Sequence, residues 1–382
     1  MSEPSESTDD VSSAPKFHTD RSHYIAAFER WFAARYPARG DLTVTDIDIP
    51  VSTGFSNETV FLNLSWTEGG ESHERRHVAR IEPTSGALFP AQTDQCAVSV
   101  EVQHRAMETV GANCDAPVPE LLGYEADPSF IGQPFFVMGF TEGRIPADTP
   151  RYSEEGFLVD EATPEERHRM VESGLTAMGQ IHNIDWRTAD LDWLDTSGTG
   201  EPSTRVQLDL YRNSTLAQLD GREHPVLDAA FDWLYANDPH DDRIGLAWGD
   251  SRLGNVIWQD YQPAAVVDWE ACALSPTEAD VGWWLMFDRM SFDEPGVARM
   301  EGFPTREEMI EIYERVSGRE VRNPHYWEVF AVMRFCAIFV PLADRMVAGG
   351  LVPAEINMPV ANMVTQSLAT LLDIENPTPS PF

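Results

Sequence analysis

Residues 246–258 read Leu246-Ala-Trp-Gly-Asp-Ser-Arg-Leu-Gly-Asn-Val-Ile-Trp258, and after a short gap the chain continues as Ala264-Ala-Val-Val-Asp-Trp-Glu270. Asp250 and Asn255 stand five positions apart in a segment that we expect to be a loop. A second acid, Asp268, ends the apolar run that follows. Two acids and a neutral amide lie close together in this stretch, so it is the best starting point for an argument about fold and chemistry.

The apolar residues between these acids have the pattern of a β-hairpin. The segments 255–258 and 264–267 are short and apolar, and residues 259–263, Gln-Asp-Tyr-Gln-Pro, can form the turn between them. Such a hairpin would present both acids to one cleft. The alternative is that the acids are ordinary turn formers, because Asp and Asn are common in loops and the chain has 63 acidic residues.

The spacing of these polar residues is typical of phosphoryl transfer to a hydroxyl group. That reaction needs one carboxylate to orient and deprotonate the hydroxyl, and a second carboxylate and an amide to hold Mg²⁺ against the phosphates. Asp250 is the candidate base, and Asn255 and Asp268 are the candidate metal ligands. The Asp-x4-Asn spacing is that of the protein-kinase catalytic loop, and Asp268 stands where the metal-binding acid would follow the next strand.

The composition restricts the kinds of partner that the protein can have. The formal net charge is −36 at pH 7, and Lys16 is the only lysine among 27 basic residues. So acidic a surface repels nucleic acid and anionic membranes, and we expect neither as a partner. The charge fits a cationic substrate, and it fits equally well an organism whose proteins are all acidic.

Targeting and membrane signals are not found in the sequence. No uninterrupted apolar run reaches the roughly 18 residues that a transmembrane helix needs, and the polar N-terminal segment has no signal-peptide pattern. The four cysteines have no metal-ligand spacing, and if the phosphoryl donor is intracellular ATP we expect no disulfides. We therefore expect a cytoplasmic protein with a disordered tail over residues 1–20 and a flexible tail over residues 374–382.

Hydrophobic periodicity divides the 382 residues into two parts, enough for two lobes with separate cores. The first part alternates strands with two helices, and the second is almost entirely helical. We predict an α+β, bilobal, protein-kinase-like fold, with a small antiparallel β-rich N-lobe over 21–140 and a larger helical C-lobe over 141–373. The predicted N-lobe elements are a helix over 24–35, strands over 42–49, 60–66 and 77–81, a helix over 93–110 and a strand over 133–140. The predicted C-lobe helices cover 164–184, 206–219, 226–236, 278–289, 306–316, 326–347 and 354–372.

Two features of the N-lobe are typical of a phosphate site. The segment 52–59, which contains Gly54, lies between two strands, and its backbone N–H groups can cradle phosphates or simply form a hairpin turn. Arg80 ends a strand at the place where a kinase carries the cation that holds the α- and β-phosphates. Glu101, in the following helix, is the acid that would pair with it. The alternative for both residues is an ordinary surface ion pair.

Taken together, these motifs resemble those of the aminoglycoside phosphotransferase-like family, which includes choline-kinase relatives and the kinase domains fused to some acyl-CoA dehydrogenases. The resemblance runs from about residue 51 to about residue 290. The family's usual His is Trp248 here, and Arg replaces Lys at position 80, as it does in the dehydrogenase-fused branch. The matching residues are Trp248-Gly249-Asp250, Asn255, Asp268-Trp269-Glu270 and Asp280.

The resemblance implies roles for further residues. Gly54, Ser56 and Asn57 match a segment that contacts the nucleotide, and backbone groups from Met138 to Phe140 would bind the adenine edge. Asp280 would hold the catalytic loop through backbone hydrogen bonds, and Trp248 would pack the loop in place of the His. Arg252 would stabilise the transferring phosphoryl group or pair with a loop acid. His182, Trp283 and Trp284 would be structural, and Glu270 would assist the metal acid or be solvated.

The activity implied by this resemblance is ATP-dependent phosphorylation of a small-molecule hydroxyl, with Mg²⁺ as the metal. An aminoglycoside-like acceptor and a hydroxyacyl-type acceptor both remain open. The alternative is a catalytically weak, nucleotide-binding pseudokinase-like protein, because Trp248 and Arg80 depart from the usual pattern. The sequence makes no prediction of the oligomeric state.

Overall fold

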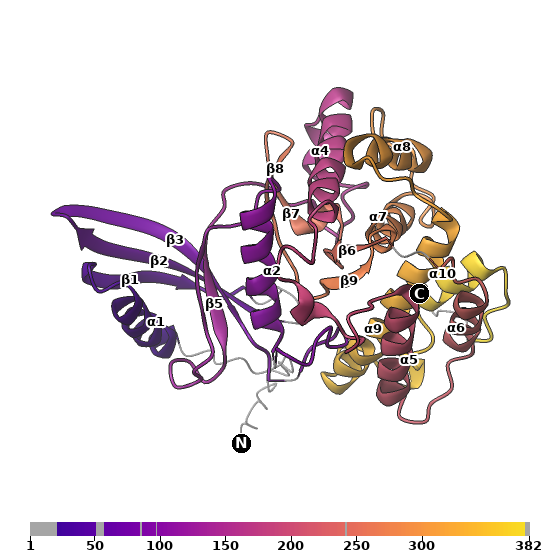
Figure 1. Cartoon of the computed structure of the whole chain (residues 1–382), viewed down its shortest axis with the longest axis horizontal. Helices are drawn as coiled ribbons and strands as arrows, with labels where there is room; N and C mark the ends of the chain where they lie inside the picture. The colour runs from indigo at the N-terminus through magenta and orange to yellow at the C-terminus, as the bar shows by residue number, and fades with distance from the viewer. Residues whose placement is uncertain (1–20, 51–56, 85, 97, 241–242, 379–382) are drawn as a thin grey trace, which may run out of the picture.

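A five-stranded antiparallel sheet forms the N-terminal part of the molecule, drawn on the left of Figure 1. The computed structural model describes residues 21–50, 57–84, 86–96, 98–240 and 243–378. The predicted tail 1–20 lies outside these residues, as do residues 379–382. The strand order is β1-β2-β3-β5-β4. The strands are β1 (Gly40–Asp48), β2 (Glu58–Glu68), β3 (Glu71–Ile81), β4 (Leu121–Glu125) and β5 (Phe135–Gly139).

The two faces of this sheet are covered by different helices. Strand residues alternate between faces, and in β5 the side chains of Phe135 and Val137 pack with helix α1 (Arg21–Arg35), whereas Phe136 packs with helix α2 (Ser99–Asn113). Helix α1 buries an aromatic stripe that includes Trp31, as its periodicity predicts. Helix α2 belongs to the same apolar core as the C-terminal part, so it joins the two parts of the molecule.

Helix α2 begins later than predicted. The helical pattern starts at Thr93, but the Thr93 hydroxyl donates to the carbonyl oxygen of Trp193 and accepts from the backbone N–H of Gln95. These side-chain bonds hold the preceding segment in a loop, and the helix starts at Ser99. Strand β4 was not predicted, because five residues around Gly123 carry too short a pattern.

Helices dominate the second part of the chain, on the right of Figure 1. Helix α9 lies in its core, where it contacts α5, α6, α7 and α10. By length and composition α9 could cross a membrane, but 89% of its apolar window is buried inside the fold, as expected for a core helix. The helices are α3 (Phe157–Asp160), α4 (Pro164–His182), α5 (Thr204–Leu219), α6 (Pro225–Ala236), α7 (Glu278–Ser291), α8 (Arg306–Ser317), α9 (Pro324–Ala348) and α10 (Met363–Leu372), with short 3₁₀ turns η1 (Asp192–Leu194), η2 (Leu253–Asn255) and η3 (Ala354–Ile356).

The last predicted helix, 354–372, is wrong in its first half. Asn357 adopts a left-handed conformation with φ +52°, which ends the short turn η3. Asn362 then caps α10, because its side-chain oxygen accepts from the backbone N–H of Thr365 at 2.9 Å. The helix proper therefore starts at Met363.

Two small β-ladders carry the segment quoted at the outset. Strand β7 (Val256–Gln259) pairs with β8 (Gln262–Val266), so the predicted hairpin is confirmed. Its turn is tighter than predicted, because Asp260 and Tyr261 both have positive φ, the geometry of a two-residue type I′ turn. Strand β6 (Ile244–Ala247) pairs with β9 (Ala273–Pro276), and neither was predicted. The loop 248–255 thus leaves β6 and enters β7.

Candidate active site

Asp250 is a buried carboxylate, 8% exposed, at the centre of the loop 248–255. Its Oδ1 accepts a hydrogen bond from the indole Nε1 of Trp283 at 2.7 Å and another from Nε of Arg252 at 3.2 Å. Among the residues that the structure describes, none donates a hydrogen bond to Oδ2. Trp283 was predicted to be core, and it is buried, but no sequence pattern pointed to its bond to Asp250, because 33 positions separate them.

The backbone of this loop is held by Asp280, the fully buried acid in the first turn of α7. The two oxygens of Asp280 accept from the backbone N–H groups of Trp248 at 2.6 Å and Gly249 at 2.8 Å. The hydroxyl of Ser251 donates to the backbone carbonyl of Asp280 at 2.8 Å. The predicted supporting role of Asp280 is therefore seen directly in its contacts.

His182 stands behind Asp280 and is also fully buried. Its Nε2 lies 2.9 Å from Asp280 Oδ2, and its Nδ1 lies 2.7 Å from the hydroxyl of Tyr313. Burial lowers the pKa of His182, although Asp280 opposes the shift. A neutral ring then donates from Nε2 to Asp280 and accepts from Tyr313. His182 supports the loop from within the core, as its structural interpretation predicts.

Trp248 occupies the position of the family's usual His and acts as packing. Its ring is buried, and its Nε1 donates to the backbone carbonyl of Val267 at 2.9 Å. The ring also lies 6.0 Å from that of Trp269. Because Val267 and Trp269 flank Asp268, this tryptophan ties the catalytic loop to the segment that carries the second acid.

Gly249 marks a close approach of two backbone segments. Its φ is +91°, and a Cβ at this position would lie 2.0 Å from the carbonyl oxygen of Ala271. The carbonyl of Gly249 accepts from Nη2 of Arg334 at 2.9 Å. Arg334 lies in α9, 85 positions away, and no sequence motif pointed to it. Only glycine fits here, so the loop is fixed on both sides of this residue.

The metal-ligand candidates are Asn255 and Asp268, which both lie near Asp250. Asn255 is buried, and its Nδ2 donates to the backbone carbonyl of Asp250 at 2.9 Å. Asp268 has φ +63°, and its side chain is 27% exposed. Its Oδ1 is hidden from solvent but accepts no hydrogen bond within the described part of the chain, and the nearest cation is Nη2 of Arg80 at 3.8 Å.

The pKa of Asp268 reflects this position. Burial raises its pKa, and the nearby charge of Asp250 raises it further, while Arg80 and Arg252 oppose the shift. A buried carboxylate oxygen without a hydrogen bond is costly unless another group compensates it. A divalent cation is such a group, so the donor set fits a metal.

The number of protein oxygens also bears on the metal. Within the described residues, no group of three or more His, Cys, Asp or Glu side chains is placed to hold a metal ion. Asp268 and Asn255 are the side chains that would supply oxygens from the protein. Mg²⁺ is commonly bound in this way, through one or two side chains together with substrate phosphates and water.

Arg80 lies near the end of β3 and points toward Asp268 rather than toward α2. Its Nη1 donates to the hydroxyl of Thr59 at 2.8 Å. The predicted pairing of Arg80 with Glu101 is wrong for this structure. Glu101 instead contacts Arg105 at 3.7 Å, because the two residues share one face of α2 at i and i+4, and it accepts from the hydroxyl of Tyr124 at 3.5 Å.

The structure describes only some of the other residues that were predicted to contact the nucleotide. Gly54 and Ser56 lie outside the described residues. Asn57 is buried, and its Oδ1 accepts from Nε2 of Gln103 at 2.8 Å, so α2 fixes this side chain. A role for Asn57 in nucleotide binding stays a prediction.

The segment predicted to bind adenine ends strand β5. Met138 pairs with Val78 across the sheet, and the backbone N–H of Phe140 donates to the carbonyl of Arg76 at 3.1 Å. The ring of Phe140 lies 4.4 Å from the guanidinium of Arg76. Nucleotide binding by Met138 and Phe140 also stays a prediction, with the N–H of Phe140 already committed to the sheet.

Arg252 is enclosed by carboxylates. Its Nη1 lies 2.6 Å from Oδ2 of Asp148, and its guanidinium lies over the ring of Phe287 at 5.0 Å. Burial works against its charge, but Asp250, Asp148 and Asp268 together raise the pKa of Arg252. Of the two roles considered for this residue, the ion pair with loop acids is the one present in this structure.

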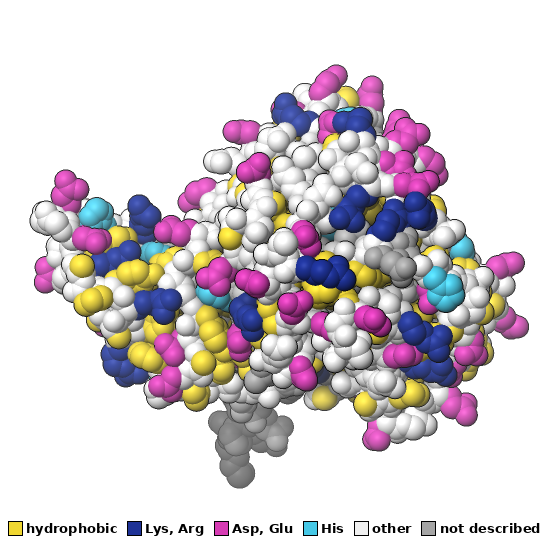
Figure 2. Space-filling view, in the orientation of Figure 1, with side chains coloured by type: hydrophobic (Ala, Val, Ile, Leu, Met, Phe, Trp, Pro, Cys, Tyr) yellow, Lys and Arg dark blue, Asp and Glu magenta, His cyan; other side chains and the backbone are white. Residues whose placement is uncertain are grey.

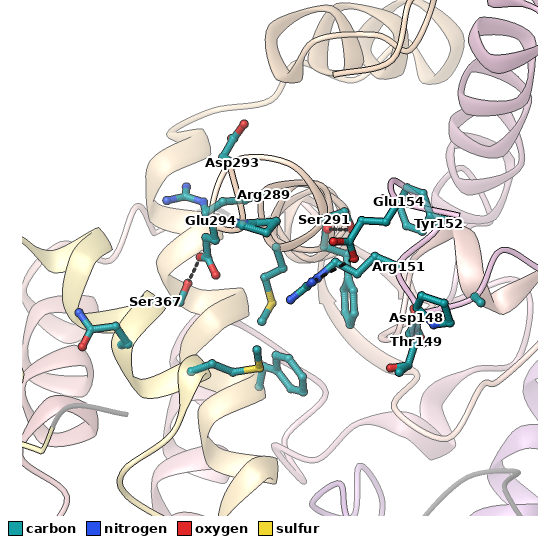
Figure 3. Close-up of a pocket in the computed structure, with 18 of the residues that line it drawn as sticks. Asp148, Thr149, Arg151, Tyr152, Glu154, Arg289, Ser291, Asp293, Glu294 and Ser367 are labelled. Carbon is teal, nitrogen blue, oxygen red and sulfur yellow. Dashed lines mark hydrogen bonds and ion pairs between the residues drawn. The ribbon is translucent and has the colours of Figure 1, made fainter. Parts of the chain in front are cut away.

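A cavity of about 1,040 Å³ opens beside Arg252. It lies between the segment 147–154, the C-terminal half of α7 and the start of α10, and Figure 3 shows Asp148 and Arg151 on one side and Glu294 and Ser367 on the other. Asp148 and Phe287, which both touch Arg252, belong to its wall. The cavity therefore adjoins the catalytic loop, and nothing in the sequence had indicated it.

The wall of this cavity combines apolar surface with acids. Arg151 pairs with Glu154 at 3.2 Å, and Glu294 accepts from the hydroxyl of Ser367 (Figure 3). The apolar part is formed by Phe287, Met290, Phe335 and Met363. Acidic side chains outnumber basic ones in the wall, but Figure 2 shows Asp and Glu dispersed over the visible face of the molecule.

Comparison with known proteins gives three results. The model of the Phosphotransferase enzyme family matches residues 49–316. Among curated proteins, Acyl-CoA dehydrogenase family member 10 of Mus musculus is 27% identical over 334 residues, which cover 83% of this chain and 28% of that protein. The chain thus spans less than a third of the length of that relative.

The solved structures show the same bilobal kinase-like fold. A Ralstonia eutropha protein assigned to the aminoglycoside phosphotransferases aligns with a TM-score of 0.64 and 20% identity, over 90% of this chain and 98% of that one. A thermostable variant of aminoglycoside phosphotransferase APH(4)-Ia, solved with ADP and hygromycin B, aligns with a TM-score of 0.52 and 14% identity, over 91% and 98% of the two chains. The predicted fold class is confirmed.

Proposed function

The chain belongs to the phosphotransferase enzyme family, and from this premise we propose that it transfers the γ-phosphoryl group of ATP to a hydroxyl group of a small molecule. The observation that carries the proposal is the arrangement of Asp250, which is held through Oδ1 and whose Oδ2 accepts from no donor among the described residues. A general base must be oriented in this way to receive a proton from an acceptor.

The chemical step needs little covalent work from the protein. The acceptor oxygen forms a bond to the γ-phosphorus while the bond from that phosphorus to the β,γ-bridging oxygen breaks, and its electron pair leaves with ADP. The proton of the acceptor hydroxyl passes to Oδ2 of Asp250. The protein contributes by positioning and by balancing charge, as in other phosphoryl transfers.

The residues around Asp250 would hold the nucleotide phosphates. Asp268 and Asn255 would hold Mg²⁺, and when bound the metal would neutralise charge on the phosphate oxygens. Arg80 would contact the phosphates from β3, because its guanidinium lies 3.8 Å from Asp268 and its planar fork suits phosphate oxygens. Support for a nucleotide comes from the structural neighbour that was solved with ADP.

The cavity between residues 147–154, α7 and α10 would hold the acceptor. Its volume of about 1,040 Å³ suits a molecule larger than a simple alcohol. Its acids favour an aminoglycoside-like cation, and a neighbour was solved with hygromycin B. Its apolar rings favour a hydroxyacyl-type acceptor, and the match to an acyl-CoA dehydrogenase family member supports that branch.

A coupled assay tests the proposal. Acceptors are first found by thermal shift with Mg-ATP, aminoglycosides, hydroxyacyl-CoA thioesters and small alcohols, since ligands that bind only the folded protein raise its melting temperature. ADP release and a phosphorylated product are then measured for wild type and Asp250→Asn. We expect turnover to fall by about a hundredfold or more in the variant, the usual contribution of a positioned base.

Two outcomes would contradict the proposal. ATP binding by wild type without turnover on any acceptor would favour the pseudokinase-like alternative. Full turnover in a folded Asp250→Asn protein would remove the base role from this residue.

A further inference from the structure

Asp250 receives both of its side-chain hydrogen bonds on one oxygen. The indole of Trp283 donates from α7 across 2.7 Å, and Arg252 donates from within the loop across 3.2 Å. Within the described residues, no donor reaches Oδ2. The two donors come from different elements and together restrict rotation of the carboxylate. Its other oxygen, Oδ2, is therefore held in one orientation.

We propose that Trp283 is a positioning residue for phosphoryl transfer, whose indole N–H fixes the orientation of the Asp250 carboxylate. The inference rests on the proposed function, because it gives Asp250 the role of the base. It adds a residue that sequence reasoning had assigned to the core alone.

The neighbouring tryptophan shows that this contact is specific. Trp283 and Trp284 are adjacent in α7 and equally hidden, at 1% and 3% exposure. The ring of Trp284 packs closely against Gly174, where an added Cβ would lie 2.8 Å from it. Within the described chain, the indole of Trp284 makes no hydrogen bond, whereas that of Trp283 is bonded to Asp250. The two residues share burial and differ in this bond.

The ring of Trp283 is itself held in place by a buried cation. The guanidinium of Arg334 lies 4.7 Å from the ring centroid, and Arg334 is 4% exposed. The same guanidinium donates to the carbonyl of Gly249 at 2.9 Å and to the hydroxyl of Tyr211 at 3.0 Å. One side chain therefore fixes both the backbone just before Asp250 and the indole that holds the carboxylate of Asp250.

The acceptor cavity supports the same arrangement from the other side. The rings of Phe287 and Phe335 lie 5.8 Å and 5.9 Å from the ring of Trp283, and both belong to the cavity wall. Phe287 also lies beneath the guanidinium of Arg252. Both donors to Asp250 therefore rest on the wall against which an acceptor would pack.

The test compares Trp283→Phe with Trp284→Phe. Each change removes a similar volume from the same helix, and only the first removes a donor to Asp250. We expect kcat to fall by about ten- to hundredfold in Trp283→Phe, the range for a hydrogen bond to a charged group. The KM for Mg-ATP should stay unchanged, and Trp284→Phe should keep a kcat close to wild type at a similar loss of melting temperature.

A spectroscopic arm keeps the inference testable if Trp283→Phe does not fold. In protein labelled with ¹⁵N-tryptophan, one indole N–H resonance should move strongly in Asp250→Ala. It should move little in Asp148→Ala, which removes the other carboxylate that pairs with Arg252. If no indole resonance behaves in this way, the contact between Trp283 and Asp250 is overturned.

The kinetic outcomes separate the two proposals. An inactive wild type would overturn the proposed function and the inference with it. An active wild type with equal kcat losses in Trp283→Phe and Trp284→Phe would overturn the inference alone, because the two variants would then differ from wild type only through packing.

Discussion

The two acids of the site lie in regions that are built very differently. The loop 248–255 around Asp250 is fixed by bonds from other elements: Asp280 holds its N–H groups and Arg334 one of its carbonyls. Asp268 itself has a left-handed backbone conformation, and the Oδ1 of its carboxylate accepts no hydrogen bond from the described residues. The orientation of Asp250, the proposed base, is thus set by the protein, whereas Asp268, the proposed metal ligand, keeps an oxygen that a ligand could complete.

This difference has a general lesson about how such a site divides its work. A base must be held in one direction before the acceptor arrives, so its support comes from the core. A metal ligand must offer an oxygen that accepts no hydrogen bond. The free-energy cost of burying that oxygen is offset only when a cation binds. Variants that act on one region should therefore leave the other largely unaffected.

The largest expected effect comes from removing the anchor of the loop. In Asp280→Ala two backbone N–H groups and the ring of His182 lose their acceptor. We expect the free energy of unfolding to fall by about 3–5 kcal/mol, as when one partner of a buried charged pair is removed. Chemical denaturation measures this, and a loss below about 1 kcal/mol, the worth of one ordinary hydrogen bond, would mean that the loop is held by other means.

Asp268→Asn should separate binding from stability. The change keeps the size of the side chain and a residue type that tolerates positive φ, so the melting temperature should stay close to that of wild type. Affinity for Mg-ATP should fall by about ten- to a hundredfold or more, since the main anionic metal ligand is lost. Isothermal calorimetry with and without Mg²⁺ makes the measurement, and unchanged affinity would remove Asp268 from the metal site.

Arg80→Ala sharpens the comparison from the N-lobe side. Arg80 is the cation nearest Asp268, and its loss should weaken ATP by about tenfold, the worth of one charged hydrogen bond. Adenosine binding should be unaffected because it has no phosphates. Equal losses for both ligands would indicate damage to the lobe rather than a missing phosphate contact.

The smallest expected effect is a dependence of the free energy of unfolding on pH. It arises from His182, which lies behind the loop 248–255. Burial lowers the pKa of His182 in the folded state, whereas in the unfolded chain it titrates near 6.5. The folded state therefore binds fewer protons, and its stability, complete above pH 6.5, is lost as the pH falls toward the folded-state pKa. One such group contributes a slope of at most about 1.4 kcal/mol per pH unit.

The control for this effect is His182→Gln. Denaturation curves of this variant between pH 7 and 5 should show a smaller slope than those of wild type. The same slope in both proteins would place the titrating group elsewhere.

The sequence predicted those features that depend on local patterns. Helix α1 and the main strands of the sheet have periodic apolar residues, the hairpin β7–β8 has two short apolar runs around a turn, and the loop acids have a recognisable spacing. Strands β6 and β9 are as short as β7, but no turn joins them, because they pair across the whole segment between Ala247 and Ala273.

The supports of the site could not be predicted for a different reason. Trp283, Arg334 and Asp148 reach the loop across 33, 85 and 104 positions, so their contacts exist only after the helices have packed. The predicted ion pair between Arg80 and Glu101 was wrong for the same reason, because the packing of α2 decides which groups the Glu101 carboxylate can contact. Spacing along the chain indicates the candidate reacting groups, whereas packing selects the residues that hold them.

The arginine at position 80 also determines how the site can be modified covalently. A lysine there would be open to acylation, which removes the charge. A guanidinium is not a target of amine-directed reagents, and Lys16, the chain's only lysine, lies outside the described residues. No lysine lies among the described residues, so amine-directed reagents would leave Arg80 and the other arginines around the site unmodified.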